Sequence, residues 1–367
     1  MSKDLEPIDI LIKTRLGFER IVASRVKELE PGIKVVPAPL GFLGLITISN
    51  SRDKYHLAQL IKEHVLEAEK VIIVEKTTKA DPYIIAKEAA KLASSKITPN
   101  ETFAVRTTRR GKHNFTSIDV NIVVGDAVRR ETNATVNLKY PDKIVLVEII
   151  RDIALISIIP GSEEYKKLRP GKHPIYNIFR KMAVIQMPYL GPLDAVKVMG
   201  TRIGREVQNF EIKELVIAPI GAIDAIQLKT FIEGVIEGIE SRYEIQRKSY
   251  GRGVQKVKVL IQDLYQLVRD RSNEVIIVFE PEGEPISRLT NELEELIIKS
   301  RKRVNLLFGS REGIPLGIYR HADLVVDLAP GVTLSTDYAA AAALIAISTL
   351  LYDRVGGSIE GINSSSR

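Results

Sequence analysis

The sequence predicts an α/β protein in which small N-terminal α+β modules precede a mostly parallel α/β domain. Three observations predict this class. Over residues 1–165, short β-type runs and helical periods are interleaved and end in a hairpin pattern. Over residues 191–357, near-continuous apolar strands alternate with amphipathic helices. Charge divides in the same way, because residues 1–190 hold 31 Lys and Arg against 22 Asp and Glu (+9), whereas residues 191–367 hold 22 against 24 (−2).

The composition excludes several kinds of site. The 367 residues include no Cys, which rules out disulfides, thiolate metal sites and cysteine nucleophiles. The five His show no HxxH or HExxH spacing, so a histidine-dominated metal site is not expected, although carboxylate sites stay open, and no residue is predicted to bind a metal. No apolar run reaches ~18 residues and the opening MSKDLEPIDI lacks a secretory pattern, so we expect a cytoplasmic protein without a membrane span. The basic front half favours a polyanionic partner, although an ordinary solvated surface gives the same balance.

Residues 1–65 are predicted to form an N-terminal domain and residues 66–165 a second α+β domain. The first contains β-type runs and helical apolar spacing in alternation, at 8–12, 17–29, 42–48 and 54–65. The second continues the alternation and ends in a hairpin, with elements at 71–74, 81–95, 103–106, 116–130, 135–138, 144–149 and 154–159. Pro82 suits the first turn of one helix, and the hydroxyl at Thr116 or Ser117 suits the cap of the next.

Two basic clusters in this half are candidate RNA-binding sites, because clustered cations attract phosphates. The first is predicted to lie on a loop after the strand at 103–106 and comprises Arg106, Arg109, Arg110, Lys112 and His113. The second comprises Lys166, Lys167, Arg169 and Lys172. Three interleaved aromatic residues either stack on unpaired bases or only pack the chain against a domain: Tyr165, Tyr176 and Phe179.

Residues 66–165 resemble the THUMP domain of RNA-modifying enzymes. The resemblance is carried by Phe103-Ala104-Val105-Arg106 with its basic loop, by Thr116-Ser117-Ile118-Asp119, and by the segments 136–142 and 145–149. It implies a binding module that grips the acceptor end of tRNA. The preceding residues 1–65 look like the ferredoxin-like domain that often precedes THUMP.

Residues 166–190 are predicted to be a linker with a short helix, because they contain Pro170, Gly171, Pro174 and Pro188. The α/β domain follows at 191–357, with a flexible tail at 358–367. Its predicted strands are 214–218, 274–279, 304–308 and 323–327, and its predicted helices are 192–207, 224–239, 286–300 and 335–352. Residues 257–268 fit either a strand or a helix.

Three loops of this domain are rich in Gly, Pro and hydroxyl groups and follow predicted strands, at 280–283, 309–315 and 328–336. In parallel sheets, ligands bind beyond the carboxyl ends of the strands. Neither GxGxxG nor GxxxxGK[ST] occurs at the strand–helix turns, which disfavours ordinary dinucleotide and triphosphate sites.

The segments 306–313 and 327–338 resemble the second and third motifs of the SPOUT superfamily of RNA methyltransferases. The resemblance implies a trefoil-knotted domain that binds S-adenosylmethionine, pairs as a homodimer and methylates RNA, with tRNA the expected substrate. The residues it implies for the cofactor are Glu280, Pro281, Gly283, Phe308, Gly309, Ser310, Gly313, Leu328, Gly331, Thr333, Leu334, Ser335 and Thr336. The sequence departs from the family where Glu282-Gly283 replaces a Gly-Thr pair of the first motif.

Arg311 and Glu312 are the candidate catalytic residues, as helpers at the acceptor group, or else an ordinary surface ion pair. Thr333 and Ser335 could cap the following helix as well as contact a cofactor. The alanines 339–343 let another helix approach closely, or else they pack only against the sheet of their own domain.

Two further functions fit less well than a methyltransferase. A non-catalytic RNA-binding adaptor would need a decayed α/β domain, and the loops look intact. A flavodoxin-like nucleotide or metabolite enzyme would explain the sheet but not the basic module.

Overall fold

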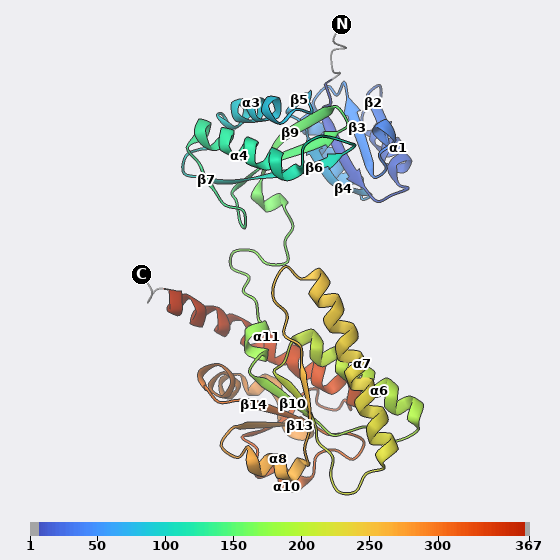
Figure 1. Ribbon diagram of the computed structural model, residues 1–367, viewed down its shortest axis with the longest axis vertical. Helices are drawn as coiled ribbons and strands as arrows, with labels where there is room; N and C mark the ends of the chain where they lie inside the picture. The colour runs from blue at the N-terminus through green and yellow to red at the C-terminus, as the bar shows by residue number, and fades with distance from the viewer. Residues whose placement is uncertain (1–6, 364–367) are drawn as a thin grey trace. The chain divides into compact units, whose positions relative to one another are not determined.

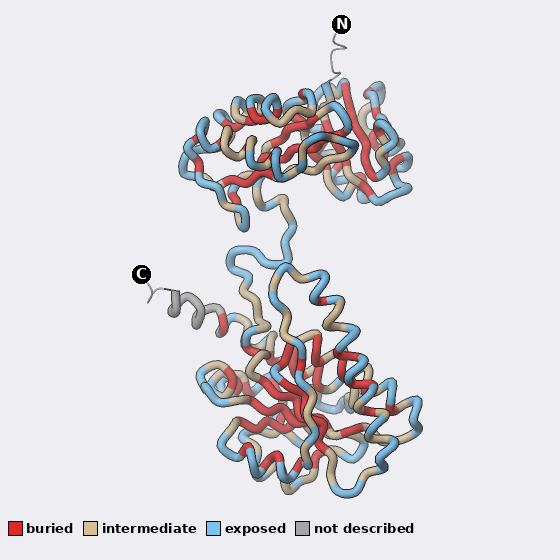
Figure 2. Tube along the Cα trace, viewed as in Figure 1, coloured by how far each residue is buried: buried red, intermediate tan, exposed pale blue. Residues whose placement is uncertain are grey.

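The computed structural model describes residues 7–363, with side chains described as far as Val355. The chain divides into two compact units, with the boundary between Pro170 and Gly171 (Figure 1). In both, the buried segments are concentrated in the central strands (Figure 2).

The N-terminal unit begins with a four-stranded antiparallel sheet in the order β2-β3-β1-β4. Its elements are β1 (Ile10–Thr14), α1 (Glu19–Leu29), β2 (Lys34–Pro37), a 3-10 turn (Pro39–Gly41), β3 (Leu45–Ser49), α2 (Lys54–His64) and β4 (Ala68–Ile73). β4 pairs with β1, with Ile73 opposite Ile10, so the predicted boundary at residue 65 is wrong. Strand β4 therefore belongs to the first sheet. The residues of a strand do not by themselves determine which sheet edge the strand pairs with.

The second sheet of this unit has the order β5-β9-β8-β6-β7. Its elements are β5 (Lys76–Lys79), α3 (Pro82–Ala93), β6 (Thr102–Arg110), α4 (Ser117–Thr132), β7 (Thr135–Val136), β8 (Lys143–Ile150), β9 (Ile153–Pro160) and a 3-10 turn (Gly161–Glu163). The predicted hairpin is confirmed, because β8 and β9 pair antiparallel over their full length. The predicted cap is confirmed as well, since Thr116 and Asp119 form a capping box at the start of α4.

The two sheets of the N-terminal unit pack face to face. Helices α3 and α4 cover one face of the second sheet. Its other face buries Leu146 and Leu155 against Leu11 and Ile72 of the first sheet. The carboxylate of Glu148, only 1% exposed, lies on this side and forms ion pairs with Lys13 of β1 and Arg110 of β6.

The C-terminal unit is built on a six-stranded parallel sheet in the order β12-β11-β10-β14-β13-β15. The predicted mostly parallel sheet is thus confirmed. Its elements are α5 (Tyr176–Phe179), β10 (Met182–Gln186), α6 (Leu193–Phe210), β11 (Glu214–Ile217), α7 (Ala225–Ser249), β12 (Lys258–Ile261), α8 (Leu264–Asp270), β13 (Val275–Pro285), β14 (Val304–Phe308), α10 (Leu316–Tyr319), β15 (Leu324–Asp327) and α11 (Thr336–Asn363). Helices α6, α7 and α11 cover one face and α8 and α10 the other.

Four predictions for this unit need correction. The predicted flexible tail at 358–367 is helical as far as Asn363, because α11 continues beyond residue 357, and residues 364–367 lie outside the described part of the chain. Residues 166–190 are not only a linker, because β10 lies within them and pairs with both β11 and β14 in the middle of the sheet. The predicted helix at 286–300 is a 3-10 turn (Ile286–Arg288), a short α9 (Thr290–Leu293) and a π-helical segment (Glu294–Lys299). The ambiguous stretch 257–268 contains a strand and then a helix, β12 and α8.

Helix α11 packs into the core of its own unit through Ala340, Ala343, Leu344 and Ile347. Within the described part of the chain, residues 336–355 of this helix form one segment long and apolar enough to cross a membrane by length and composition alone. Its buried face packs with α6 and the sheet, as in the core helix of a globular domain. The described side chains therefore support the interpretation that the alanines allow close packing within the same chain.

Candidate active site at the carboxyl edge of the parallel sheet

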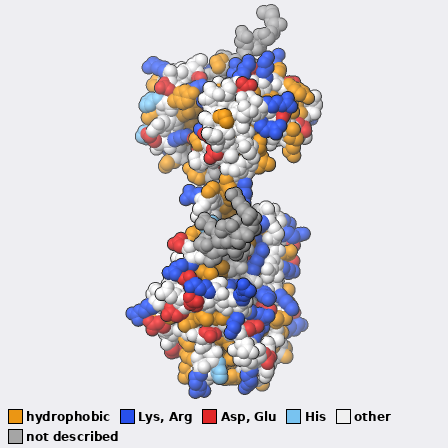
Figure 3. All heavy atoms as spheres, turned by 90° about the vertical axis from the view of Figure 1, so that its left-hand side faces the viewer, with side chains coloured by type: hydrophobic (Ala, Val, Ile, Leu, Met, Phe, Trp, Pro, Cys, Tyr) orange, Lys and Arg blue, Asp and Glu red, His pale blue; other side chains and the backbone are white. Residues whose placement is uncertain are grey.

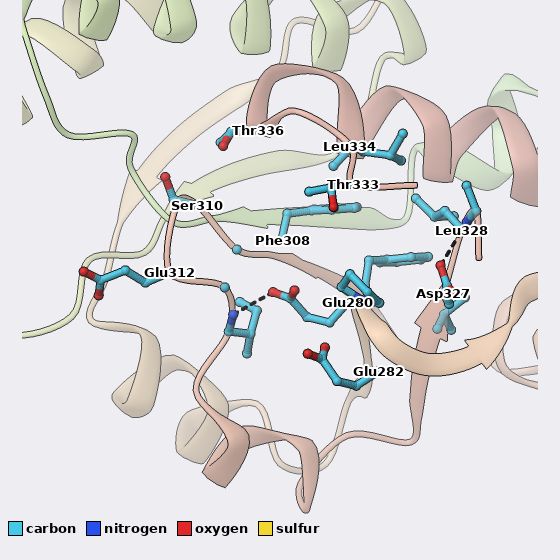
Figure 4. A pocket seen from close by; sticks show the side chains of 18 of the residues that line it. Glu280, Glu282, Phe308, Ser310, Glu312, Asp327, Leu328, Thr333, Leu334 and Thr336 are labelled. Atoms are coloured by element: carbon cyan, nitrogen blue, oxygen red, sulfur yellow. Dashed lines mark hydrogen bonds between the residues drawn. The ribbon is translucent and has the colours of Figure 1, made fainter. Parts of the chain in front are cut away.

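The predicted loop at 280–283 lies within β13, where the register with β15 shifts between Phe279 and Glu284. This irregular segment meets the loops after β14 and β15 at one edge of the sheet, because the three strands are parallel neighbours. The last aromatic residues of two strands, Phe279 and Phe308, stack with ring centroids 4.9 Å apart and planes 7° from parallel. Together the loops enclose a cavity of about 460 Å³, which we call the acidic cavity (Figure 4).

Most of the residues predicted to contact a cofactor line this acidic cavity. They are Glu280, Pro281, Phe308, Gly309, Ser310, Gly313, Leu328, Thr333, Leu334 and Thr336, and both catalytic candidates, Arg311 and Glu312, line it too. Ten further lining residues were not predicted: Phe279, Glu282, Ile314, Leu316, Tyr319, Val326, Asp327, Ala329, Val332 and Ala339. Four of them lie inside the predicted loops and four within two residues of the ends of those loops, so the loop segments with their flanking residues carried the signal that could have found them.

The carboxylate of Glu280 links the segment 280–283 to the loop 309–315. Its Oε1 accepts a hydrogen bond from the backbone N–H of Ile314 at 2.6 Å. Burial raises the pKa of this carboxyl above its ordinary value, and the nearby charge of Glu282 raises it further. A Cβ at Gly309 would lie 2.5 Å from Glu280 Oε1 and 2.7 Å from Gly313 Cα, so glycine is what lets the loops close around the carboxylate.

Two more carboxylates make the lining of the cavity acidic. The Tyr319 hydroxyl donates to Glu282 Oε2 at 3.3 Å, and Asp327 Oδ1 accepts from the Ala329 N–H at 2.9 Å. Burial and the charges of Glu280 and Glu282 raise the pKa of Tyr319 far above its ordinary value, so its hydroxyl stays protonated as a donor. With Glu312, four carboxylates line the cavity against one cation, Arg311, and this excess of negative charge favours a ligand that carries positive charge.

Arg311 and Glu312 are both exposed, and no ion pair joins them in the part of the chain that the structure describes. The Arg311 guanidinium lies over the Tyr189 ring, 5.5 Å from its centroid. Figure 4 shows the Glu312 side chain directed away from Glu280 and Phe308. The alternative that these two residues form a surface ion pair with each other is therefore wrong, and their catalytic role stays a prediction.

Three predicted cofactor residues do not line the acidic cavity. Gly283 runs against β15, where a Cβ would lie 2.4 Å from the Val326 nitrogen, so the glycine permits a close crossing of two chain segments. Gly331 adopts a positive φ of 82° in a turn. The Ser335 hydroxyl donates to Asp337 Oδ1 at 2.8 Å and so helps to hold the start of α11.

Ser310 is distinctive among the lining residues. Its Oγ is buried, and it has no hydrogen-bond partner among the residues that the structure describes. Buried hydroxyl groups in native proteins are nearly always hydrogen-bonded, so this unpaired hydroxyl is an exception to the usual pattern.

The first basic cluster is not a loop. Arg106, Arg109 and Arg110 lie on β6, which is longer than predicted because it pairs with β8 as far as Arg110. Arg106 donates to Glu164 at 3.0 Å and to the Leu138 carbonyl at 2.8 Å. With Arg110 on the buried Glu148, two of the predicted RNA-binding cations are already neutralised inside the unit.

In the rest of this cluster, Lys112 is exposed, whereas Arg109 and His113 are half-buried. Arg109 lies 3.3 Å from His113 Nδ1 and over the Phe115 ring, and His113 Nε2 lies 2.7 Å from the Arg151 carbonyl. In Figure 3, Lys and Arg side chains are visible on the drawn face of both units, and over the C-terminal unit they are intermixed with Asp and Glu.

The second cluster is partly engaged as well. Lys166 contacts Glu164 at 2.8 Å and the Lys139 carbonyl at 2.6 Å, and its ammonium lies over the Tyr140 ring. The other three members have exposed side chains: Lys167, Arg169 and Lys172.

The three aromatic residues have separate roles. Tyr165 is 99% exposed. Phe179 is buried against Phe210, and the Tyr176 ring is covered by Arg252, whose guanidinium carbon is 3.9 Å from the ring centroid. Packing therefore explains Tyr176 and Phe179, and Tyr165 alone stays a candidate for base stacking.

Comparison with known proteins adds the family. The model for the AF2226-like SPOUT RNA methylase fused to THUMP matches residues 176–364, and the THUMP model matches residues 79–159. The chain belongs to this SPOUT RNA methylase family. Both resemblances found in the sequence are thereby confirmed, and the family model starts close to α5, which agrees with β10 being part of the domain rather than of a linker.

Three relatives of this family member illustrate its two parts. It is 42% identical to the uncharacterized protein MJ0421 of Methanocaldococcus jannaschii over 342 residues, which is 92% of each chain. It is 35% identical over 149 residues to a tRNA sulfurtransferase of Vibrio campbellii, covering 39% of this chain and 31% of that one. It is 47% identical over 68 residues to the tRNA (guanine(6)-N2)-methyltransferase of Methanocaldococcus jannaschii, covering 17% of this chain and 18% of that one.

Proposed function

We propose that this SPOUT RNA methylase uses S-adenosylmethionine as its methyl donor and that its RNA substrate is tRNA. The observation that carries the proposal is the convergence of the end of β13 and the loops after β14 and β15 on one acidic cavity. The tRNA part is supported by the THUMP match and by two partial relatives whose names place them on tRNA.

The lining of the acidic cavity fits the proposed donor. S-adenosylmethionine supplies a methyl group bonded to a positively charged sulfur, and it also carries an ammonium group. Glu280, Glu282 and Asp327 favour those positive charges. The stacked Phe279–Phe308 pair with Leu328 and Leu334 offers the apolar surface that an adenine ring requires.

The residues of this chain contribute by orientation rather than by covalent chemistry. Glu280 holds the loop 309–315 in place through the Ile314 N–H, and Gly309 and Gly313 keep the backbone close to the carboxylate. A fixed loop positions donor and acceptor, which supplies much of the rate enhancement in a transfer reaction. We assign the RNA-docking role to the exposed cations Lys112, Lys167, Arg169 and Lys172 and to the half-buried Arg109.

The test uses the purified full chain. Calorimetry with S-adenosylmethionine measures donor binding, and tritium transfer from the labelled donor to unmodified tRNA transcripts measures activity, with an rRNA fragment of equal length as the comparison. We expect saturable binding and transfer to tRNA. Binding without transfer to either RNA would favour an RNA-binding adaptor, and transfer to the rRNA fragment alone would overturn the tRNA assignment.

A further inference from the structure

The amino edge of the parallel sheet, at the opposite end of the strands from the acidic cavity, is rich in cations. The segments 240–258 and 294–303 lead into β12 and β14, and together they hold ten Lys and Arg against four Glu. Because β12, β11, β10 and β14 are consecutive parallel neighbours, their amino ends lie along one edge. Nothing in the proposed function above uses this edge.

The carboxylates at this edge are already neutralised. Two buried ones, Glu211 and Glu214, each bind two guanidinium groups. The four carboxylates of the two basic segments also have cationic partners: Glu240, Glu244, Glu294 and Glu295. The remaining cations therefore present uncompensated positive charge.

Five exposed cations at this edge have no side-chain partner among the described side chains, residues 7–355, and we call them the amino-edge surface: Lys213, Lys248, Lys258, Arg301 and Lys302. Structural roles account for two of them. Lys248 lies in the last turn of α7, where a cation stabilises the helix end, and Lys258 lies on an edge strand, where Lys hinders pairing with other strands. Neither role applies to the other three, which lie outside helices and strands, just before β11 and β14.

These three cations flank the start of β10. β10 lies between β11 and β14, and its first residues pair with Glu214 on one side and Val304 on the other. Neighbouring strands lie about 4.8 Å apart, so the chain positions of Lys213 and Lys302 are about 10 Å apart across the sheet. Between them, the Lys181 ammonium donates to the Ser300 carbonyl at 3.2 Å and so ties the segment before β14 to β10.

The surroundings of the amino-edge surface favour a nucleic acid over an acidic protein. Among the exposed large hydrophobic residues of the described chain, Ile245 alone lies in the two basic segments. Protein–protein interfaces have an apolar or aromatic core, whereas nucleic-acid interfaces are polar and strongly positive. Cations that no carboxylate neutralises suit phosphates, which displace counterions from them.

We propose that the amino-edge surface is a second RNA-docking site, which binds phosphates of the RNA that is methylated at the acidic cavity. This inference rests on the proposed function and adds an RNA contact made by the C-terminal unit itself. Strands β10, β11 and β14 have four or five residues, so the two edges of the sheet are about 15 Å apart. That distance corresponds to about five nucleotides of a stacked strand, so one RNA can contact both edges.

The first test removes the three cations that have no structural role. A variant combining Lys213→Ala, Arg301→Ala and Lys302→Ala should lower the slope of log affinity for tRNA against log salt by about 3, because each phosphate contact contributes about one unit. Fluorescence anisotropy across a salt series measures the slope. The thermal midpoint should stay unchanged, since these side chains have no partners among the described side chains.

The matched control removes the same charge from cations that already pair with carboxylates. It combines Lys197→Ala, Lys229→Ala and Arg288→Ala, whose partners are Glu237, Glu233 and Glu284. Its slope should fall by less than about one unit, because phosphates would have to displace those carboxylates. Equal losses of slope in the two triple variants would overturn the proposal, since they would show that only the total charge matters.

Methyl transfer supplies a second readout. Loss of the amino-edge cations should raise KM for tRNA and leave kcat unchanged, because these contacts are equally strong before and during the reaction. Affinity for S-adenosylmethionine should also be unchanged, and a loss of that affinity would overturn the proposal. If the unaltered protein neither binds tRNA nor transfers a methyl group, the proposed function itself fails, and that result is distinct from these.

A crosslinking experiment locates the contact. The chain contains no Cys, so Lys302→Cys can be labelled at one position with a photoreactive azide, and Lys229→Cys is the control. After irradiation with labelled tRNA, we expect a covalent adduct from Lys302→Cys and much less from the control. Equal adducts would overturn the proposal. Binding of poly-glutamate that depends on these cations, with no tRNA adduct, would overturn it in favour of an acidic protein partner.

Discussion

The two units of this protein use their conspicuous residues in opposite ways. In the N-terminal unit, Arg106 and Arg110 look like phosphate ligands in the sequence but are neutralised internally by Glu164 and Glu148. In the C-terminal unit, loops far apart in the sequence converge, and most of their predicted residues line one cavity. The difference teaches that a cluster of cations in the sequence indicates positive charge but not which residues neutralise it. A loop at the carboxyl end of a parallel strand, in contrast, lies where the topology of the sheet places it.

The largest expected effect concerns the glycine that closes the acidic cavity. Gly309→Val places side-chain atoms where Glu280 and Gly313 already lie, so donor affinity should fall by about 1000-fold, or about 4 kcal/mol. Gly317→Val is the control, because a Cβ there meets only the end of the Arg320 side chain at 3.8 Å. Calorimetry checks both. Retained affinity in the first variant would mean that the donor binds elsewhere.

The second prediction concerns the internal ion pairs of the N-terminal unit. Glu148→Gln leaves Lys13 and Arg110 without their carboxylate at a site where Glu148 is 1% exposed, so the free energy of unfolding should fall by about 3 kcal/mol. Glu163→Gln breaks an exposed pair with Lys62 and should change it by less than about 1 kcal/mol. Denaturant unfolding measures both. Equal losses would contradict the view that Glu148 is structural.

The third prediction separates the engaged cations from those assigned to RNA docking. Arg109→Ala combined with Lys112→Ala should lower the slope of log affinity against log salt by about 2, because each phosphate contact contributes about one unit. Arg106→Ala should leave the slope unchanged, since its guanidinium is bound to Glu164 and the Leu138 carbonyl. Fluorescence anisotropy with tRNA across a salt series provides the slopes. If Arg106→Ala lowers the slope as much as the double change, the division between the cations is wrong.

The smallest effect concerns Glu280, whose folded-state pKa is raised, first by burial and then by Glu282. A raised folded pKa means that the ionised form lowers stability, and this loss develops as pH rises from the unfolded pKa of about 4.3 through the folded value. Glu280→Gln should therefore raise the thermal midpoint slightly at pH 7 and have no effect near pH 4. It should at the same time weaken donor binding at pH 7. A lower midpoint at pH 7 would show that the charge stabilises the loop.

The sequence predicts segments well where the local pattern is complete. Residue spacing predicts the hairpin of β8 and β9, the capped start of α4 and the strand–helix alternation after β11. It does so because each of these patterns is contained in the residues of the element itself. β10 was missed because its five residues stand among prolines that are typical of a linker. Its place in the middle of the sheet comes from pairing with β11 and β14, which are distant in the chain. The trefoil knot, the homodimer and the cytoplasmic location remain predictions.

The sequence by itself determined the two kinds of domain and the three loops that carry the candidate site, since apolar periodicity and turn residues act over a few positions. Only the tertiary structure decided which cations are neutralised, that Glu280 bonds to the second loop, and that Gly283 serves a chain crossing. The physical reason is distance. Hydrogen bonds, ion pairs and steric contacts depend on which atoms lie within a few ångströms, and in these cases the partners come from separate strands and loops.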